Sequence, residues 1–326
     1  MDRRRILPGV VAALGMLILI LDSKTALHGA AEGIDLCIRS VIPSLFPFFL
    51  LSGIVVKSMT GTKLPLLRPL GQLLGIPAGA ETLLISAFLG GYPVGAKCIR
   101  DAWAGGGISK RDAERMLWFC CNAGPAFLFG MVGPLFPSGK SSSILWGIHI
   151  TAALIIGFFH PGKSEETAKL PVSGNVNISI SLLDTIKVTA QVCGWILIFR
   201  VLLTFLGRWF LWILPEWLQV TITGFLELSN GCLDLASVNS EPIRFLLCSA
   251  MLSFGGCCVA LQTRSVTQGL NLRGYYLGKL LQMVLSLLLS SMYLGLISPL
   301  WLLSIPLASL CQKNRKNSSI PAILRV

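Results

Sequence analysis

Charged residues are scarce in this chain: Asp, Glu, Lys and Arg together make up 13% of its 326 residues. A soluble globular domain carries about 25% charged residues, so this chain has too few charges to cover a water-facing surface. That scarcity excludes a cytosolic enzyme. Disorder is excluded as well, because disordered segments are poor in apolar residues and 53% of this chain is hydrophobic. The sequence therefore predicts an integral membrane protein.

The sequence also lacks recognisable groups of catalytic or metal-binding residues. The histidines His28, His149 and His160 lie far apart, and no Ser/His/Asp or paired-carboxylate arrangement stands out. The ten cysteines lack zinc-type spacing, and buried thiols behave as small hydrophobic groups. The vicinal pairs Cys120-Cys121 and Cys257-Cys258 could bind a soft metal, but no other ligand converges on them. We therefore expect no enzymatic activity, no cofactor and no metal.

Basic residues outnumber acidic ones by 27 to 15, which gives a formal net charge of +12. Such an excess could attract nucleic acid or anionic lipid. Here the basic residues lie between apolar runs and are not clustered along one segment. This distribution favours a lipid bilayer over nucleic acid as the partner.

Several apolar runs approach the roughly 20 residues that a membrane-crossing helix needs. Ile6–Leu21 follows Arg3–Arg5 like a signal peptide, but no small-residue cleavage site follows it, so we expect a retained helix. Leu280–Gln312 contains 33 uncharged residues, about 50 Å as a helix, and is expected to break at Ser298-Pro299. The other predicted spans are Ser40–Val56, Met116–Gly139, Ser141–Gly162, Leu182–Leu206 and Phe245–Thr263.

Two further apolar segments are too short and too interrupted to cross the membrane. Thr82–Lys97 runs into Gly90-Gly91-Tyr92-Pro93, and Val220–Leu235 is interrupted at Glu227-Leu-Ser-Asn-Gly231. Short broken segments at corresponding places in two halves are typical of transporter binding sites. Non-helical backbone is tolerated at that depth only where it lines a cavity or is buried in protein. The two segments are therefore predicted to be re-entrant helical hairpins.

The order of elements is alike in the two halves, although few residues are identical. Each half has an apolar helix, a broken segment, a helix with small residues in its middle and a long apolar helix. With the N-terminus in the cytoplasm, most Lys and Arg fall on the cytoplasmic side, and the second half starts from the opposite side. This predicts an all-α polytopic fold with two inverted repeats, although chance similarity of apolar sequences is an alternative. The expected segments are 1–22 (N-terminal helix), 23–162 (repeat 1), 163–180 (cytoplasmic linker), 181–311 (repeat 2) and 312–326 (basic tail).

The breaks supply the candidate binding residues. Half-helix N-termini at mid-membrane attract anions, glycine lets backbone approach a solute, and amide or phenol side chains offer hydrogen bonds. The same glycines could instead be helix-packing contacts, and Tyr92 or Gln262 could lie at the membrane interface. The predicted solute-binding residues are Gly90, Gly91, Tyr92, Pro93, Asn122, Gly124, Glu227, Ser229, Ser253, Gly255, Gly256 and Gln262.

Two ionisable residues stand inside apolar segments, where a charge is costly unless it is wet or paired. We expect Glu227 to carry a coupling proton or cation, or to pair with a basic group such as Arg200. Arg200 could alternatively extend outward to the interface near Arg208.

The broken segments resemble those of a known group. Gly90-Gly-Tyr-Pro-Val-Gly-Ala-Lys97, Asn122–Phe127, Glu227–Gly231 and Ser253–Gln262 are similar to motifs of the nucleoside-recognition gate proteins, and within that group of the sporulation integral membrane proteins of endospore-forming bacteria. The resemblance implies a core similar to that of concentrative nucleoside transporters. It also implies a role in spore formation, in which dipicolinate is moved across the outer forespore membrane.

We therefore expect a multi-pass permease for a small polar or anionic solute, with dipicolinate as the implied solute and the outer forespore membrane as the implied location. A nucleoside-type transporter is one alternative, and a membrane scaffold for spore maturation without a solute pathway is another. A second copy of the chain could be a partner.

Overall fold

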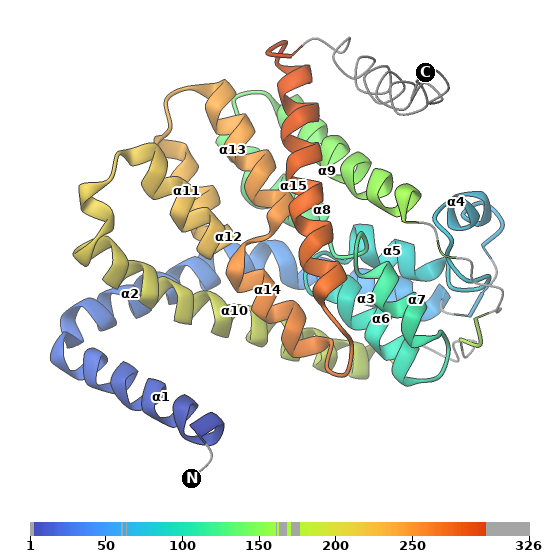
Figure 1. Cartoon of the computed structure of the whole chain (residues 1–326), viewed down its shortest axis with the longest axis horizontal. Coiled ribbons are helices and arrows are strands. Elements are labelled where there is room, and N and C mark those ends of the chain that lie inside the picture. The colour runs from blue at the N-terminus through green and yellow to red at the C-terminus, as the bar shows by residue number, and fades with distance from the viewer. Residues whose placement is uncertain are drawn as a thin grey trace, which may run out of the picture.

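The computed structural model describes residues 3–297 except 60, 63, 161, 163–167 and 171–176. Every regular element within those residues is a helix (Figure 1). Five helical stretches of this described part are long and apolar enough to cross a bilayer. They are Ser23–Met59, Gly139–Phe159, Ile178–Trp209, Glu241–Val266 and Arg273–Tyr293. The chain is a multi-pass helical membrane protein, as its scarcity of charge predicts.

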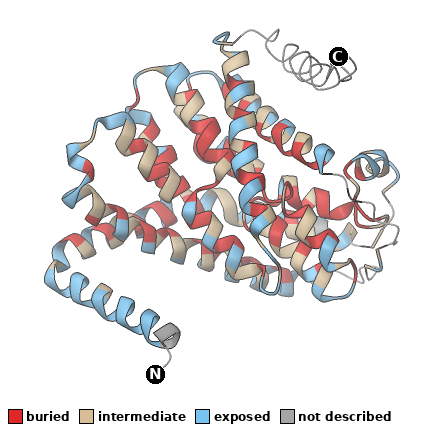
Figure 2. Ribbon diagram, viewed as in Figure 1, coloured by how far each residue is buried: buried red, intermediate tan, exposed pale blue. Residues whose placement is uncertain are grey.

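The N-terminal helix stands apart from the body of the protein (Figure 1). This helix, α1, spans Arg3–Leu21 and leads into α2, Ser23–Leu36, against which it packs. Its side chains from Ile6 onward are almost all exposed (Figure 2). Its apolar part, Ile6–Leu21, is shorter than the five stretches named above.

One long helix takes the place of the predicted span Ser40–Val56. α2 continues through a π-helical turn, Cys37–Val41, directly into α3, Ile42–Met59. The predicted span starts at Ser40, directly after Arg39, whereas the helix continues through Arg39 and Asp35. These two residues form an ion pair one helical turn apart on the exposed surface, so both charges are tolerated within the helix.

Two pairs of short helices form where the sequence predicts broken segments. Pair 1 consists of α5, Thr82–Leu89, and α6, Val94–Ala104, which pack together. Pair 2 consists of α11, Glu216–Leu226, and α12, Leu228–Asp234, joined at Glu227. The helices of each pair approach closely because a glycine lies at the contact, as at Gly231, where a Cβ atom would lie 2.0 Å from the Gly224 Cα.

Two of the predicted spans are interrupted, the first directly after its start and the second near its middle. The prediction that Met116–Gly139 forms one membrane-crossing helix is wrong. Helix α7 ends at Met116, and the chain becomes helical again only at Pro125. The second interruption lies at Gly255, which adopts a left-handed φ of 84° that favours glycine. The elements concerned are α7 (Lys110–Met116), α8 (Pro125–Phe127), a π-helical turn (Leu128–Val132), α13 (Glu241–Phe254) and α14 (Gly256–Val266).

The longest single α-helix, α10, spans Ile178–Trp209 and runs antiparallel to α2 and α3 (Figure 1). Near one end a Cβ atom at Gly29 would lie 2.6 Å from the Thr204 Oγ1, and near the other end Lys57 pairs with Asp184. Small residues of this kind let membrane helices approach closely.

The other helices complete the body. They are α4 (Arg68–Leu73), α9 (Gly139–Phe159) and α15 (Arg273–Tyr293), with 3-10 turns at Gly133–Leu135, Leu211–Ile213 and Leu235–Ser237. The predicted span from Leu280 is the later part of α15, which begins seven residues earlier. Its predicted break at Ser298-Pro299, its continuation to Gln312 and the tail 312–326 lie outside the described residues, as does much of the linker 163–180.

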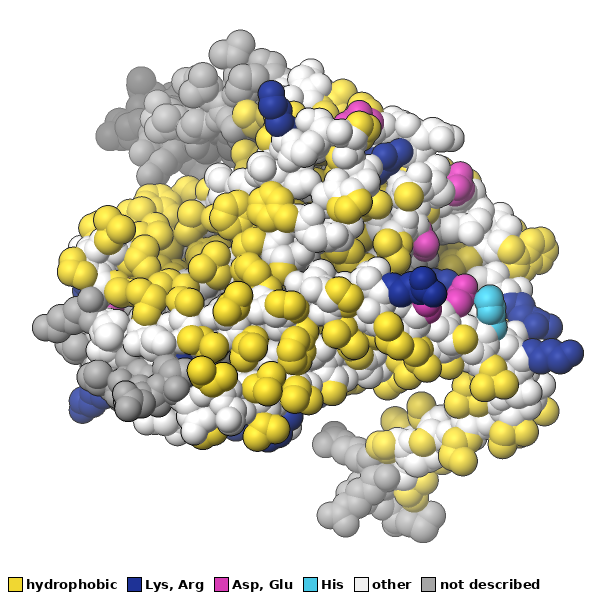
Figure 3. Space-filling model, turned by 180° about the vertical axis from the view of Figure 1, so that it is seen from behind, with side chains coloured by type: hydrophobic (Ala, Val, Ile, Leu, Met, Phe, Trp, Pro, Cys, Tyr) yellow, Lys and Arg dark blue, Asp and Glu magenta, His cyan; other side chains and the backbone are white. Residues whose placement is uncertain are grey.

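Hydrophobic side chains cover a broad part of the face shown in Figure 3, while Lys, Arg, Asp and Glu gather in small groups. Such an apolar exterior suits contact with lipid.

Candidate functional site

A central cavity lies where the two helix pairs meet the breaks in the longer helices. With its open mouth included it holds about 480 Å³ of empty space, but only about 40 Å³ of this is available to the centre of a water-sized sphere. Small-molecule sites are typically about 300–1,000 Å³ and mostly apolar with a few polar groups. The cavity has that kind of lining but is much smaller, so it has to widen to hold a solute. Its walls are Leu45, Phe48, Phe49, Gly90, Gly91, Tyr92, Gly124, Ala126, Phe127, Val192, Ile196, Glu227, Leu228, Ser229, Val259 and Gln262.

Seven of the twelve residues that the sequence analysis selected lie in this wall. They are Gly90, Gly91, Tyr92, Gly124, Glu227, Ser229 and Gln262. Of the others, Pro93 follows Tyr92 at the tip of pair 1, and Gly255 and Gly256 form the break between α13 and α14. Asn122 and Ser253 are fully buried behind the cavity. The structure thus gathers residues from four separate motifs around one space.

The tip of pair 1 packs on the first interruption through two glycines. Gly91 has a φ of 69°, and a Cβ atom there would lie 3.1 Å from the Gly124 nitrogen. At the second interruption, Gly256 has a φ of 78°, and a Cβ atom there would lie 3.1 Å from the carbonyl oxygen of Gly224 in pair 2. The tip of pair 1 at Gly91 and the second interruption at Gly256 therefore each need glycine, both for the backbone conformation and for the close approach.

Tyr92 connects pair 1 to the second interrupted helix. Its hydroxyl donates a hydrogen bond to the carbonyl oxygen of Leu252 over 2.5 Å. The Lys279 ammonium of α15 lies 5.3 Å from the centre of the Tyr92 ring, on the scale of a cation–π contact. Tyr92 is therefore held within the protein and does not anchor at the membrane interface.

A buried network of polar side chains lies behind the cavity. The Gln282 amide nitrogen donates to the Asn122 Oδ1 over 3.0 Å and to the His149 carbonyl oxygen over 3.1 Å. The Gln282 Oε1 in turn accepts from the Lys279 ammonium over 2.6 Å. His149 Nδ1 lies 3.2 Å from the Ser253 hydroxyl. These contacts join α9, α13 and α15 to the first interruption.

Sequence reasoning missed the importance of three members of this network: His149, Lys279 and Gln282. The signal available in the sequence was a Lys three residues before a Gln next to a long apolar run, because ionisable groups in a membrane helix are functional candidates by default. Lys279 was instead read as the polar boundary of an apolar run, and His149 as an isolated residue.

Glu227 is 1% exposed and caps α12 with its own carboxylate. Its oxygens accept hydrogen bonds from the Ser229 nitrogen over 3.1 Å and from the Asn230 nitrogen over 2.7 Å. The Asn230 side-chain amide donates a third bond over 2.6 Å. The N-terminus of α12 is thus already occupied by a carboxylate, which corrects the expectation that this half-helix would attract an anionic solute directly.

Arg200 does not pair directly with Glu227. Its guanidinium donates to the Glu32 carboxylate over 2.9 Å and to the Asn230 Oδ1 over 3.1 Å, so Asn230 connects it to Glu227. Arg200 is therefore held between α2 and pair 2 and does not extend toward Arg208, which contacts Thr25.

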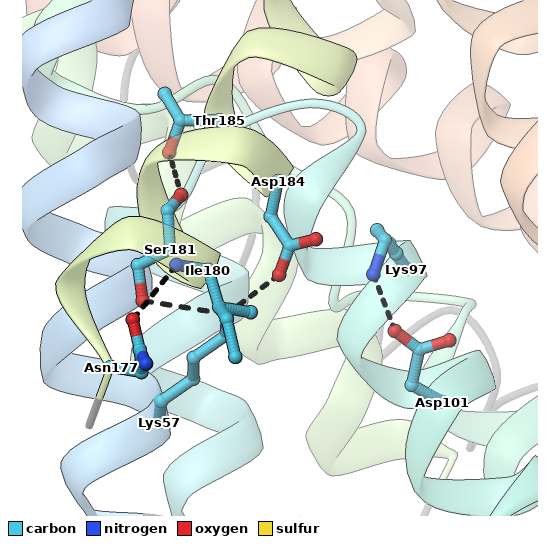
Figure 4. A network of polar contacts seen from close by, with 8 residues as sticks. All are labelled: Lys57, Lys97, Asp101, Asn177, Ile180, Ser181, Asp184 and Thr185. Atoms are coloured by element: carbon cyan, nitrogen blue, oxygen red, sulfur yellow. Dashed lines mark hydrogen bonds and ion pairs between the residues drawn. The ribbon is translucent and has the colours of Figure 1, made fainter. Parts of the chain in front are cut away.

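Two wider openings flank the central cavity along α10. The lysine vestibule is lined by Phe49, Lys57, Lys97, Asp101, Asp184 and Thr185 among others (Figure 4). About 320 Å³ of it is available to the centre of a water-sized sphere. The arginine vestibule is lined by His28, Glu32, Arg200, Arg208, Glu216 and Asp234 among others, and about 660 Å³ of it is available to the centre of a water-sized sphere. One face of α10 lines all three spaces in order, with Val188 in the first, Ile196 in the second and Leu203 in the third.

The cysteine pairs do not form a metal site in the described part of the chain, where no group of three or more His, Cys, Asp or Glu is placed to hold a metal ion. Cys120 and Cys121 are buried free thiols, and Cys258 accepts a hydrogen bond from the Gln262 amide over 3.3 Å. Gln262 therefore faces Cys258 and the cavity, away from the lipid headgroups.

Comparison with known proteins gives one informative similarity. No family model and no solved structure matches the chain. The chain is 29% identical over 140 residues to the sporulation integral membrane protein YlbJ of Bacillus subtilis (strain 168). The match covers 41% of this chain and spans only 34% of the length of that relative. The chain is thus a multi-pass helical membrane protein with similarity to a sporulation integral membrane protein.

Proposed function

We propose that the chain is a transporter that carries a small polar solute through the central cavity, and that it acts during spore formation. One observation carries the proposal: both helix-pair tips, the first interruption and α14, which follows the second interruption, converge on one cavity midway along α10. Broken helices that meet at a cavity are the usual construction of a transporter binding site. The similarity to a sporulation membrane protein supports the second part of the proposal.

Reciprocal packing supports two inverted repeats with re-entrant hairpins. α6 of pair 1 contacts α14 of the second half, and α12 of pair 2 contacts the π-helical turn Leu128–Val132 of the first half. The leading helices of the two halves, α2–α3 and α10, also lie antiparallel, because Gly29 contacts Thr204 and Lys57 pairs with Asp184. A fold with opposite insertion of its halves accounts for both features.

The charge of the cavity wall restricts which charge the bound solute can carry. Among the described residues of its wall, Glu227 alone is an acid or base that is normally charged at neutral pH. An anion beside an ionised, water-poor carboxylate is repelled, so the proposed transport of dipicolinate requires Glu227 to hold a proton while the solute is bound. The rings of Tyr92, Phe48 and Phe49 offer apolar faces to a planar solute.

The same carboxylate favours a second candidate, a nucleoside-type solute. Sugar hydroxyl groups donate hydrogen bonds, and an ionised carboxylate accepts them strongly. A neutral solute of this kind binds beside Glu227 without a proton on the carboxylate.

Reconstituted protein tests the proposal and separates the two solutes. Purified full-length chain in liposomes is supplied with labelled dipicolinate or labelled uridine, and uptake is compared with protein-free liposomes. Saturable dipicolinate uptake that rises as the pH falls supports the first solute. Uridine uptake with little pH dependence supports the second. If neither solute nor any polar solute of the native spore is moved by folded protein, the scaffold alternative replaces transport.

Orientation and location belong to the same proposal. We place the N-terminus and the segment 163–180 in the cytoplasm and the chain in the outer forespore membrane. The ion pair of Lys57 with Asp184 supports part of this, because it puts the end of α3 on the same side as the start of α10.

A further inference from the structure

Four Asp, Glu, Lys or Arg side chains are buried among the residues that the structure describes, and two of them lack an opposite charge. Glu81 and Asp112 each pair with an arginine. Glu227 of the cavity wall and Lys279 of α15 form no ion pair within the same residues. The four buried side chains are Glu81, Asp112, Glu227 and Lys279.

Lys279 lies in the membrane-crossing part of α15, about 9 Å along the helix from Arg273 at its start. Helix α15 packs against α9 and α13 (Figure 1), and the Lys279 side chain is 2% exposed. Within the described part of the chain, its ammonium donates one hydrogen bond, to the Gln282 Oε1. A buried charge is costly unless an opposite charge offsets it. A neutral donor would satisfy Gln282 as well, so this hydrogen bond does not account for the charge.

The ionisable groups that surround Lys279 in the described part of the chain supply no negative charge at neutral pH. They are the thiols of Cys120 and Cys121, the Tyr92 phenol and the His149 imidazole. Thiols and phenols are ordinarily uncharged at neutral pH, and imidazole becomes positive when it takes up a proton. The positive charge of Lys279 is therefore not compensated by these neighbours.

Tyr92 separates this charge from the central cavity. The Lys279 ammonium lies 5.3 Å from the centre of the Tyr92 ring, and Tyr92 lines the cavity whereas Lys279 does not. A solute atom that touches the ring lies roughly 4 Å beyond it, and so within about 10 Å of the ammonium. At that separation, and at an effective dielectric constant of about 20, two unit charges attract each other enough to change affinity on the order of tenfold.

We propose that Lys279 determines the charge of the transported solute: its buried ammonium, held behind Tyr92, makes the central cavity favour an anion over a neutral molecule. A carboxylate of the solute at the Tyr92 ring supplies the negative charge that the neighbours of Lys279 do not. Glu227 acts in the opposite sense, so the anion binds while Glu227 holds a proton. The inference rests on the transport function proposed above and names the class of solute that the cavity selects.

Two probes of one shape and different charge test this role. Binding of labelled dipicolinate and of labelled pyridine-2,6-dicarboxamide, its uncharged diamide, is measured on the purified full-length chain in detergent at constant pH. Lys279→Met keeps most of the apolar stem of the side chain but removes the charge. It should bind dipicolinate about tenfold more weakly and the diamide as the wild type does. Lys140→Met, at an exposed lysine of α9 outside the cavity, should leave both affinities unchanged.

Lys279→Arg keeps a permanent positive charge and should retain the preference for dipicolinate. Thermal unfolding shows whether each variant is folded, and Lys279→Gln, which is also neutral, replaces Lys279→Met if the latter is not. A purely structural lysine would make the neutral variant bind both probes more weakly, and that result would overturn the role.

Unchanged dipicolinate affinity in the folded neutral variant would also overturn the role of Lys279 and would leave the transport function intact. A folded wild-type chain that binds no dipicolinate, or binds the diamide more tightly, would overturn the proposed selectivity. The transport function, by contrast, fails only if reconstituted protein moves no solute.

Discussion

Gly91 and Gly124 meet backbone to backbone: a Cβ atom at Gly91 would lie 3.1 Å from the Gly124 nitrogen and 3.3 Å from its Cα. The contact joins the tip of pair 1 to the first interruption, and both residues line the central cavity. The position of the tip therefore depends on the absence of a side chain at residue 91.

We expect Gly91→Val to abolish solute uptake while the protein still inserts into the membrane, and Gly91→Ala to reduce uptake strongly. Either side chain forces the tip away from Gly124 and strains a backbone with φ of 69°. Gly106→Ala is the matched control, because Gly106 has a φ of 71° but no neighbouring atom within 4 Å of a Cβ atom. Equal effects of the alanine variants at 91 and 106 would show that strain alone matters.

A second expectation concerns the buried network behind the cavity. Gln282→Leu leaves the Lys279 ammonium and the Asn122 Oδ1 without their Gln282 partner, at a cost of about 1–3 kcal/mol for each unsatisfied group. Thermal unfolding in detergent should show a clearly lower midpoint for this variant. Gln72→Leu, at an exposed position of α4, should leave the midpoint nearly unchanged. Similar midpoints for the two variants would contradict the importance of the network.

Arg200 offers a third test, because it joins Glu32 of α2 to Asn230 of pair 2. Arg200→Gln removes the hydrogen bonds to Glu32 and weakens the hold on pair 2. We expect unfolding to become easier by about 1–3 kcal/mol and the segment 227–234 to exchange its amide hydrogens faster. Arg208→Gln, at a side chain that is 60% exposed, is the control. Unchanged exchange in 227–234 would mean that Arg200 does not hold pair 2.

Topology is the fourth expectation. Reporter fusions after Lys63, Ser164 and Arg264 should all indicate the cytoplasm, and a fusion after Ser138 should indicate the far side. This follows from the proposed orientation, in which α9 returns the chain to the cytoplasm before α10 begins. If Ser138 and Ser164 report the same side, the inverted-repeat proposal is wrong.

Much of the site was predictable because polar or flexible residues interrupt apolar runs. Gly90–Pro93 and Glu227 cannot continue a plain membrane helix, so the two helix pairs could be located from sequence. The aromatic and aliphatic walls were not predictable. Phe49, Val192 and Ile196 look the same in sequence whether they face lipid, the core or a cavity.

The start of the long helix α2–α3 was predicted wrongly for a different reason. Asp35 and Arg39 come directly before the apolar run Ser40–Val56 in the sequence, yet within the helix the two charges pair with each other. Hydropathy alone therefore places the start of the long helix too late. The partner of Arg200 was missed because Glu32 lies 168 residues away in the chain.

The most direct test of the account is uptake of labelled solute by liposomes that contain either Glu227→Gln or the control Glu241→Gln, an exposed carboxylate at the start of α13. The amide keeps the volume of Glu227 and an oxygen that can cap α12, but it cannot take up or release a proton. We expect Glu227→Gln to insert normally and to lose transport or its pH dependence, and Glu241→Gln to behave as wild type. Transport with an unchanged pH profile in Glu227→Gln would contradict the claim that the solute passes Glu227 in the central cavity.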